Sequence, residues 1–157
     1  MPYSIFFSHS GADHQWAQWI AQAARNSGIG VYLFEHDPQP GRPLAEKIKA
    51  SINSSDALVV LLTLRSQFSA YVQQEIGYAE AQRKLIIPLV WTGAQKPALA
   101  MLEGREYVPF DPARPHVALN TLVTYLYKLR AKKEATQALL GVGALVIAAV
   151  ALLGGQK

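Results

Sequence analysis

The segment from Ala57 to Thr63 constrains the fold of this chain more than any other. It reads ALVVLLT and is apolar throughout. A short strand of this kind has to be covered on both faces, which is the environment of a central strand in a parallel sheet. The sequence therefore predicts a sheet with helices on both sides and this strand at its centre.

Strand patterns and helix patterns alternate along the rest of the chain. Expected strands cover residues 3–8, 31–34, 57–63, 85–90 and 107–110, and expected helices cover residues 14–26, 43–52, 71–83 and 117–133. Pro88 indicates that its strand lies toward an edge or ends there. The alternation predicts an α/β fold with a doubly wound, five-stranded parallel sheet, in which ligands bind beyond the carboxyl ends of the strands.

The last twenty residues form an apolar tail. Residues 138–153 carry no charge, and the uncharged stretch 135–155 has 21 residues. As a helix, these two lengths span about 24 Å and about 31 Å, against about 30 Å for the hydrocarbon core of a bilayer. We expect a soluble domain over residues 1–130, a basic juxtamembrane segment over 131–137 and a transmembrane helix over 138–155. The alternative is an apolar helix that packs onto the domain or into an oligomer core.

The charges indicate a membrane partner. Residues 1–127 hold ten Lys or Arg and ten Asp or Glu, whereas residues 128–157 hold five basic residues and one acidic residue. A DNA-binding domain needs a basic face of its own, so no nucleic-acid partner is expected. Positive flanks stay in the cytoplasm, which predicts a single-pass, tail-anchored protein of the cell membrane with a cytoplasmic domain. The first residues do not resemble a signal peptide.

Several kinds of catalytic site are excluded by what the sequence lacks. Without cysteine it has no disulfide, thiolate zinc site or cysteine nucleophile. It also lacks a Walker A motif, a complete dinucleotide-binding glycine motif and a G-x-S-x-G turn. Its four histidines are not spaced as metal ligands, so no metal site is expected.

The expected helix over residues 71–83 carries the most informative side chains. Glu75 lies beside the apolar stripe that includes Val72 and Ile76, and Tyr71 lies one turn earlier on the same side. A buried carboxylate costs several kcal/mol unless it is paired or hydrogen-bonded. Glu75 is therefore either a satisfied structural acid or a functional acid in a cleft. With Tyr71 it suits a ligand that has a planar ring and sugar hydroxyls.

Three blocks of sequence resemble a known family. Residues 4–10 (SIFFSHS, with Asp13), residues 35–41 (EHDPQPG, with Leu44) and residues 69–77 (SAYVQQEIG) are similar to segments of Toll/interleukin-1 receptor (TIR) domains, particularly bacterial ones. The third block resembles the S-x-W-x-x-x-E segment, whose glutamate is catalytic in members that cleave NAD+. Tyr71 stands where the family usually has tryptophan. The resemblance covers about residues 3–130.

The resemblance implies a flavodoxin-like sheet and one of two roles, which are cleavage of NAD+ or docking without activity. For the enzyme, it implies that Glu75 acts on the ribose and that the residues around the substrate are Ser8, His9, Ser10, Asp37 and Tyr71. Loop capping is the alternative role for residues 8–10, and a turn before proline is the alternative role for Asp37.

The chemistry favours the enzyme. Breaking the nicotinamide–ribose bond develops oxocarbenium-like charge, which a nearby carboxylate stabilises. NAD+ would be the substrate, no separate cofactor is expected, and the products would be nicotinamide and ADP-ribose or a cyclic isomer. A non-catalytic scaffold and a deoxyribosyl transferase that acts on free nucleosides are the alternatives.

The family also implies self-association, in which the loop after the second strand of one subunit completes the site of its neighbour. A membrane anchor would favour this assembly by concentrating the domains. The resemblance further implies a role in bacterial defence against phage.

Overall fold

The protein forms a five-stranded parallel sheet flanked by helices. The computed structural model describes residues 2–34, 46–66, 69–93 and 104–154. The strands are β1 (Ser4–Ser8), β2 (Gly30–Leu33), β3 (Ala57–Leu62), β4 (Leu85–Trp91) and β5 (Val108–Phe110). They lie in the order β2-β1-β3-β4-β5, and every neighbouring pair is parallel. This is the flavodoxin-like, doubly wound order. The α/β class and the central place of the buried strand 57–62 are confirmed.

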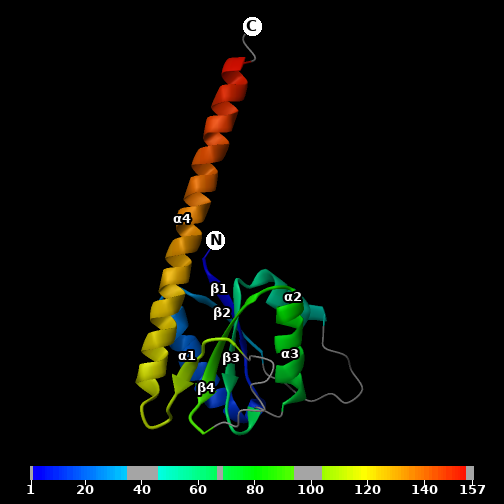
Figure 1. The fold of residues 1–157 in the computed structure, drawn as a ribbon, viewed down its shortest axis with the longest axis vertical. Helices are drawn as coiled ribbons and strands as arrows, with labels where there is room; N and C mark the ends of the chain where they lie inside the picture. The colour runs from blue at the N-terminus through cyan, green and yellow to red at the C-terminus, as the bar shows by residue number, and fades with distance from the viewer. Residues whose placement is uncertain (1, 35–45, 67–68, 94–103, 155–157) are drawn as a thin grey trace.

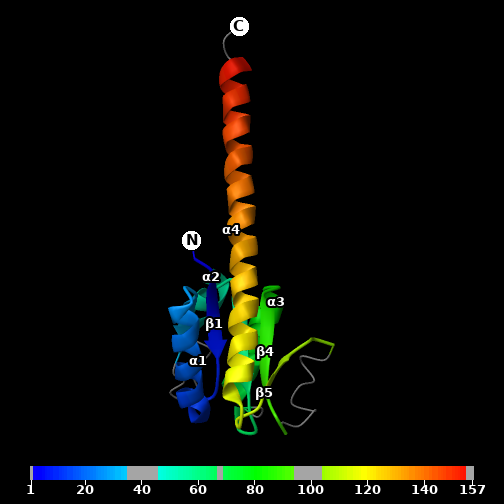
Figure 2. The same cartoon turned by 90° about the vertical axis from the view of Figure 1, so that its left-hand side faces the viewer.

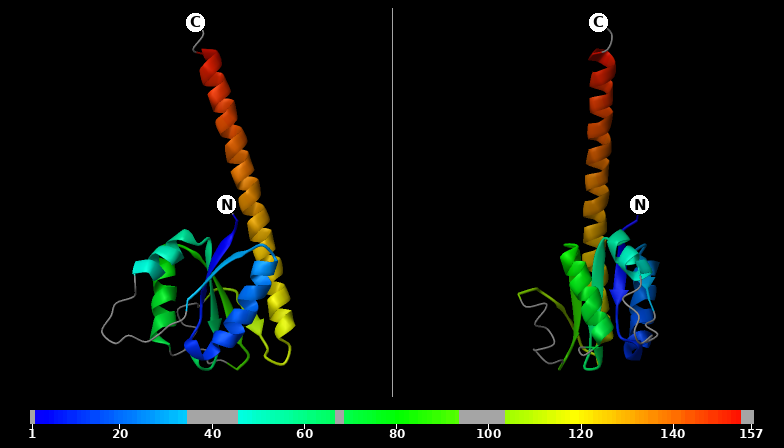
Figure 3. Two further views of the ribbon diagram at one scale, coloured as in Figure 1. Left: turned by 180° about the vertical axis from the view of Figure 1, so that it is seen from behind. Right: turned by 90° about the vertical axis from the view of Figure 1, so that its right-hand side faces the viewer.

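Helices cover both faces of the sheet. They are the short 3-10 helix η1 (Gly11–Asp13), α1 (His14–Asn26), α2 (Glu46–Ser54), α3 (Ala70–Ala81) and α4 (Pro115–Gly154). Figure 1 shows three layers, with α1 and α4 on one side of the strands and α2 and α3 on the other; Figure 3 adds the view from behind and the view from the α3 side. Side chains alternate along β1, so that Phe7 packs toward α1 and α4 while Phe6 packs toward α2 and α3.

β4 lies next to the edge strand β5, in agreement with the prediction from Pro88 that its strand lies toward an edge. It lies between β3 and β5, and Pro88 stands opposite Val60 of β3. On the other side, the pairing with β5 begins only at Leu89. Proline has no N–H to donate, but no hydrogen bond to β5 is lost, because β5 does not pair with β4 at this position. β4 can therefore accommodate Pro88.

The last helix and the tail form one continuous helix of 40 residues. Its first half packs on the sheet through a stripe at every fourth position, made of the buried Ala118, Leu122 and Leu126. Its second half projects past the end of the domain where the N-terminus lies (Figures 1 and 2). Leu139 is 74% exposed and Leu152 is 75% exposed. The apolar tail therefore does not pack back onto its own domain.

Two basic residues of α4 hold the helix against the sheet. Lys133 Nζ lies 3.0 Å from Asp56 Oδ2, just before β3. Arg130 Nη1 donates to the carbonyl oxygens of Ser27 at 3.3 Å and Gly28 at 3.4 Å, just after α1. Gly28 has φ +80°, and a Cβ at this position would meet the Arg130 guanidinium. Glycine therefore both ends α1 and leaves room for the arginine.

Candidate functional site

A hydrogen-bond network joins the loops that follow β1 and β3. Asp13 Oδ2 accepts a hydrogen bond of 2.8 Å from Ser10 Oγ and one of 2.7 Å from Thr63 Oγ1. Asp13 precedes α1, where a capping bond is expected, but its side chain makes none. Its carboxylate instead holds the two loops together at the carboxyl end of the sheet.

The turn after β3 is closed by Thr63 and Ser66. Ser66 Oγ accepts from the Thr63 amide at 2.7 Å and donates to the Leu61 carbonyl oxygen at 2.9 Å, while the Ser66 amide donates to Thr63 Oγ1 at 3.1 Å. The individual roles of Thr63 and Ser66 were not predicted from the sequence. Their signal was a threonine and a serine three residues apart after a buried strand, a spacing typical of side-chain-capped turns.

The three residues expected to line the site from β1 have different surroundings. Ser10 bonds to Asp13, as described above. His9 is fully buried, with Nε2 lying 3.1 Å from His14 Nδ1 and Nδ1 lying 3.4 Å from the Phe7 carbonyl oxygen. Ser8 is also fully buried, and its Oγ has no hydrogen-bond partner in the described part of the chain.

Glu75 lies on the inward face of α3, between the buried Val72 and Ile76. Ser69 caps this helix by accepting a hydrogen bond of 3.4 Å from the Val72 amide. None of the Glu75 side chain is exposed to solvent in the single chain. The predicted placement of Glu75 on the apolar stripe is therefore confirmed, and its carboxylate is fully shielded from solvent.

Ser8 and Glu75 belong to the same layer of the molecule. Because side chains alternate along β1, Ser8 follows Phe6 onto the face that α3 covers. Tyr71 lies one turn before Glu75 on α3 and is half-buried. Asp37 lies outside the described residues. The structure thus brings Ser8, Tyr71 and Glu75 to the α3 side of the sheet, toward its carboxyl end.

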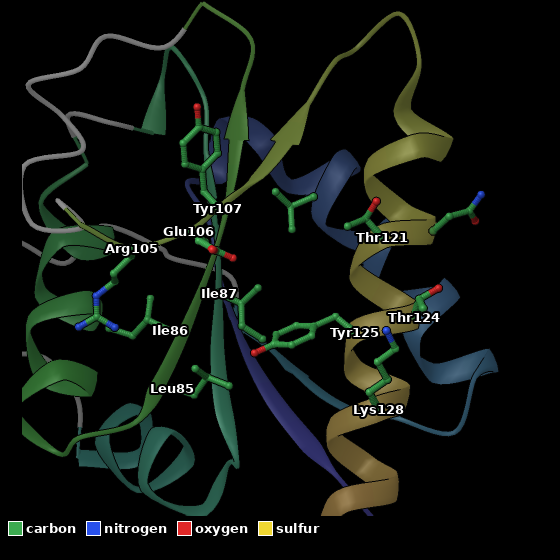
Figure 4. A pocket seen from close by; sticks show the side chains of 12 residues that line it. Leu85, Ile86, Ile87, Arg105, Glu106, Tyr107, Thr121, Thr124, Tyr125 and Lys128 are labelled. Atoms are coloured by element: carbon green, nitrogen blue, oxygen red, sulfur yellow. The ribbon is translucent and has the colours of Figure 1, made fainter.

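A groove of about 780 Å³ lies elsewhere, between the start of β4, the segment before β5 and the first half of α4 (Figure 4). It exists because β5 pairs with β4 only from Leu89 onward, so no strand of the described chain lies beside the first half of β4 on that side. Its lining includes Leu85, Ile87, Tyr107, Tyr125 and Lys128. None of the predicted site residues that the structure describes lines it, so this groove and the buried acid are separate features.

The described segments contain no candidate metal-binding site. No three His, Asp or Glu side chains gather there in a way that could hold a metal ion.

Comparisons with known proteins identify the family. A model of the TIR domain matches residues 5–123. Among solved structures, the RPS4–RRS1 TIR-domain heterodimer has a TM-score of 0.62 at 13% identity, covering 82% of this chain and 97% of that one. Diflavin flavoprotein A3 from Nostoc sp. has a TM-score of 0.55 at 14% identity, covering 85% and 99%. The CMP N-glycosidase BcmB from Clostridium botulinum has a TM-score of 0.54 at 14% identity, covering 78% and 98%.

At these identities the solved structures support the fold alone, and no curated protein matches the chain. The family model spans the sheet, the helices around it and the Glu75 segment. The chain belongs to the TIR-domain family.

Proposed function

We propose that this protein cleaves NAD+ at the nicotinamide–ribose bond and that Glu75 is its catalytic residue. The proposal rests mainly on the position of the Glu75 carboxylate, which lies on the inward face of α3 and is fully buried. The aromatic ring of Tyr71 lies one turn earlier on the same helix. A carboxylate acts most strongly on developing positive charge where water is excluded, because the local dielectric constant is low.

The reaction needs little from the protein beyond this charge. The C1′–N bond breaks, its electron pair leaves with nicotinamide, and the ribose acquires oxocarbenium character that the Glu75 carboxylate stabilises. Nicotinamide leaves as a neutral molecule, so no acid has to protonate it. Water then adds at C1′ and loses a proton to give ADP-ribose, or a ring nitrogen of the same molecule adds to give a cyclic isomer.

The remaining site residues would hold the substrate. Tyr71 offers a ring for stacking, and Ser8 offers a buried hydroxyl on the face that carries Glu75. His9 and Ser10 would shape the loop after β1 through their bonds to His14 and Asp13. Asp37 would act from the loop after β2.

Activity should depend on assembly. NAD+ cannot reach a side chain that has no exposed surface, so the segments around Glu75 have to move before the reaction begins. Contacts between TIR domains would supply the energy for this movement. A membrane-spanning tail would raise the local concentration of domains and favour those contacts. In a bacterium, NAD+ loss or a cyclic product would serve defence against phage.

The burial of Glu75 also favours a second candidate, a scaffold that signals by TIR–TIR docking without catalysis. A fully buried acid is as well suited to a structural role.

One protein of similar fold is described as a CMP N-glycosidase. This makes nucleotides and free nucleosides the necessary comparison substrates for the proposed reaction.

The experiment measures nicotinamide release from NAD+ by the full-length protein at increasing density in lipid vesicles. We expect release that rises steeply with density and is lost in Glu75→Gln. Glu80→Gln is the matched control, because Glu80 is exposed on the same helix and pairs with Arg105 at 2.7 Å. Equal release by wild type and Glu75→Gln, or none at any density, contradicts the enzyme. Release of base from CMP or deoxynucleosides instead of NAD+ would reassign the substrate.

The membrane anchor is part of the proposal and has its own test. α4 is the one helix of the described chain that is long and apolar enough to cross a bilayer, and its apolar window is entirely unburied. Deleting residues 134–157 is expected to move the protein from the membrane fraction to the soluble fraction. Full-length protein that stays soluble without detergent would contradict the anchor.

A further inference from the structure

We infer that the end of the domain formed by the amino ends of the strands is a docking surface for an anionic bilayer. This inference rests on the proposed membrane anchor. It adds to that proposal a fixed orientation, in which the carboxyl end of the sheet, with Glu75, points away from the membrane.

No linker separates the domain from the tail in the described part of α4. Lys133 is the last residue of α4 with a hydrogen bond to another part of the described chain, to Asp56 and to the Pro2 carbonyl oxygen. The helix then continues without a break to Gly154. From Lys133 to residue 138 it rises only about 8 Å, close to the thickness of one head-group layer. A domain held at Lys133 therefore lies directly on the membrane surface.

This position turns the amino ends of the strands toward the membrane. The residues that α4 contacts through Arg130 and Lys133 are Pro2, Ser27, Gly28 and Asp56, which precede or adjoin the amino ends of β1, β2 and β3. Lys84, just before β4, binds the carbonyl oxygens of Asn53 at 2.7 Å and Ser55 at 2.8 Å. These bonds hold the amino-end loops together at the level where the tail leaves the domain (Figures 1 and 2).

Basic side chains are exposed at this end of the domain. Lys84, Arg130 and Lys133 satisfy carbonyl and carboxylate oxygens of the domain, as described above. Arg83, Lys128 and Lys132 are exposed in the same region and make no hydrogen bond or ion pair within the described segments. Lysines and arginines near an anionic bilayer are attracted to it. At the opposite end, the turn after β5 carries Asp111 and Arg114, whose charges cancel, and the turn after β3 carries the exposed Arg65.

The apolar half of α4 distinguishes between the two anionic partners that could bind this surface, a nucleic acid and a bilayer. A nucleic acid would also attract Arg83, Lys128 and Lys132, but the unburied apolar half of α4 leaves the domain at this same end, on the side that α1 covers. A bilayer accommodates that helix and the cations together. Because a strand of six residues is about 20 Å long, the carboxyl end of the sheet lies about that far from the bilayer. TIR–TIR contacts are then free to form in a layer parallel to the membrane.

The absence of cysteine makes a direct test simple. Single cysteines at Gln82, at the amino end, and at Ala113, at the carboxyl end, are both exposed and take a fluorescent label. The full-length chain is placed in vesicles of phosphatidylcholine, with or without phosphatidylglycerol, that carry a nitroxide quencher on the head group. We expect strong quenching at residue 82 and little at residue 113. Phosphatidylglycerol should increase the quenching at residue 82.

Charge variants complete the test. In Arg83→Gln with Lys132→Gln, the increase that phosphatidylglycerol causes at residue 82 should be lost. Arg114→Gln, which neutralises an exposed arginine at the far end, should keep it. Equal quenching at both labels, stronger quenching at residue 113, or indifference to phosphatidylglycerol overturns the inference while the anchor stands. Failure of the chain to float with the vesicles overturns the anchor and the docking surface together.

Discussion

Lys133 and Asp56 form an ion pair across 77 positions of sequence, with Nζ and Oδ2 3.0 Å apart. Asp56 also accepts a hydrogen bond of 2.8 Å from the Ser4 amide. One carboxylate thus joins the start of β1, the start of β3 and the last domain-bound turn of α4. The helix that carries the tail is therefore held by the same residue that aligns two central strands.

Asp56→Ala should lower the free energy of unfolding by about 1–3 kcal/mol, because it removes the acceptor of the Ser4 amide and the ion-pair partner of Lys133. Urea unfolding in detergent measures this change. Asp111→Ala is the control, since that exposed carboxylate accepts only the Ala113 amide of its own turn. Equal losses in both variants would mean that the Asp56 contacts add nothing specific.

Tyr3 should make stability fall in alkaline solution. Burial, together with the nearby Asp56 and Tyr125, raises the pKa of its phenol from 10.0 to about 12. The folded state favours the neutral phenol, so this contribution is complete below pH 10 and is lost as the pH rises toward 12. Tyr3→Phe cannot ionise and should lose less stability over that interval, by on the order of 2 kcal/mol. Unfolding curves at both pH values measure the difference, and Tyr127→Phe, at an exposed tyrosine, should behave as wild type.

Thr63→Val should loosen the carboxyl end of the sheet. The hydroxyl donates to Asp13 at 2.7 Å and accepts from the amides of Arg65 and Ser66, both at 3.1 Å. Removing it from a buried position should cost about 1–3 kcal/mol. Faster hydrogen exchange in the loops after β1 and β3 would locate the effect. Thr121→Val serves as the control, because that exposed hydroxyl donates only to its own helix, and it should be nearly neutral.

The two halves of α4 should respond differently to truncation. Leu122 is fully buried against the sheet, so Leu122→Ala should cost about 2–5 kcal/mol of domain stability. Leu140 is 69% exposed, and Leu140→Ala should leave the unfolding of the domain unchanged. Calorimetry in detergent measures both variants. A matching loss in Leu140→Ala would instead mean that the tail packs on protein.

If Tyr71 stacks on a ring of NAD+, Tyr71→Ala should raise KM, whereas Tyr71→Trp and Tyr71→Phe should keep it near the wild-type value. Stacking of a base on an aromatic side chain contributes about 1–3 kcal/mol, which corresponds to an increase of about five-fold or more. Steady-state nicotinamide release measures this change. A Phe variant as impaired as the Ala variant would assign the effect to the hydroxyl instead of the ring.

Individual residues show which features of the fold and the site could be predicted from the sequence. The run 57–62 predicted a central strand because a segment that is apolar on both faces can be satisfied only between two layers, and β3 is buried at all six positions. The stripe of Val72, Glu75 and Ile76 predicted the inward position of Glu75, because helical periodicity is a local property. Pro88 indicated a strand toward an edge, but the position at which β5 begins to pair with β4 is not a local property and could not be predicted.

The sequence by itself determined the layers, the strand pattern, the buried acid and the apolar tail, since each follows from the spacing of apolar side chains along a short segment. Only the tertiary structure decided that Asp13 bonds to Thr63 and that Lys133 bonds to Asp56. These partners lie 50 and 77 residues apart, and any of several carbonyl or carboxylate groups satisfies a hydroxyl or an ammonium equally well. The choice among them is made by the packing of the sheet and helices, which brings one partner within bonding distance and leaves the others out of reach.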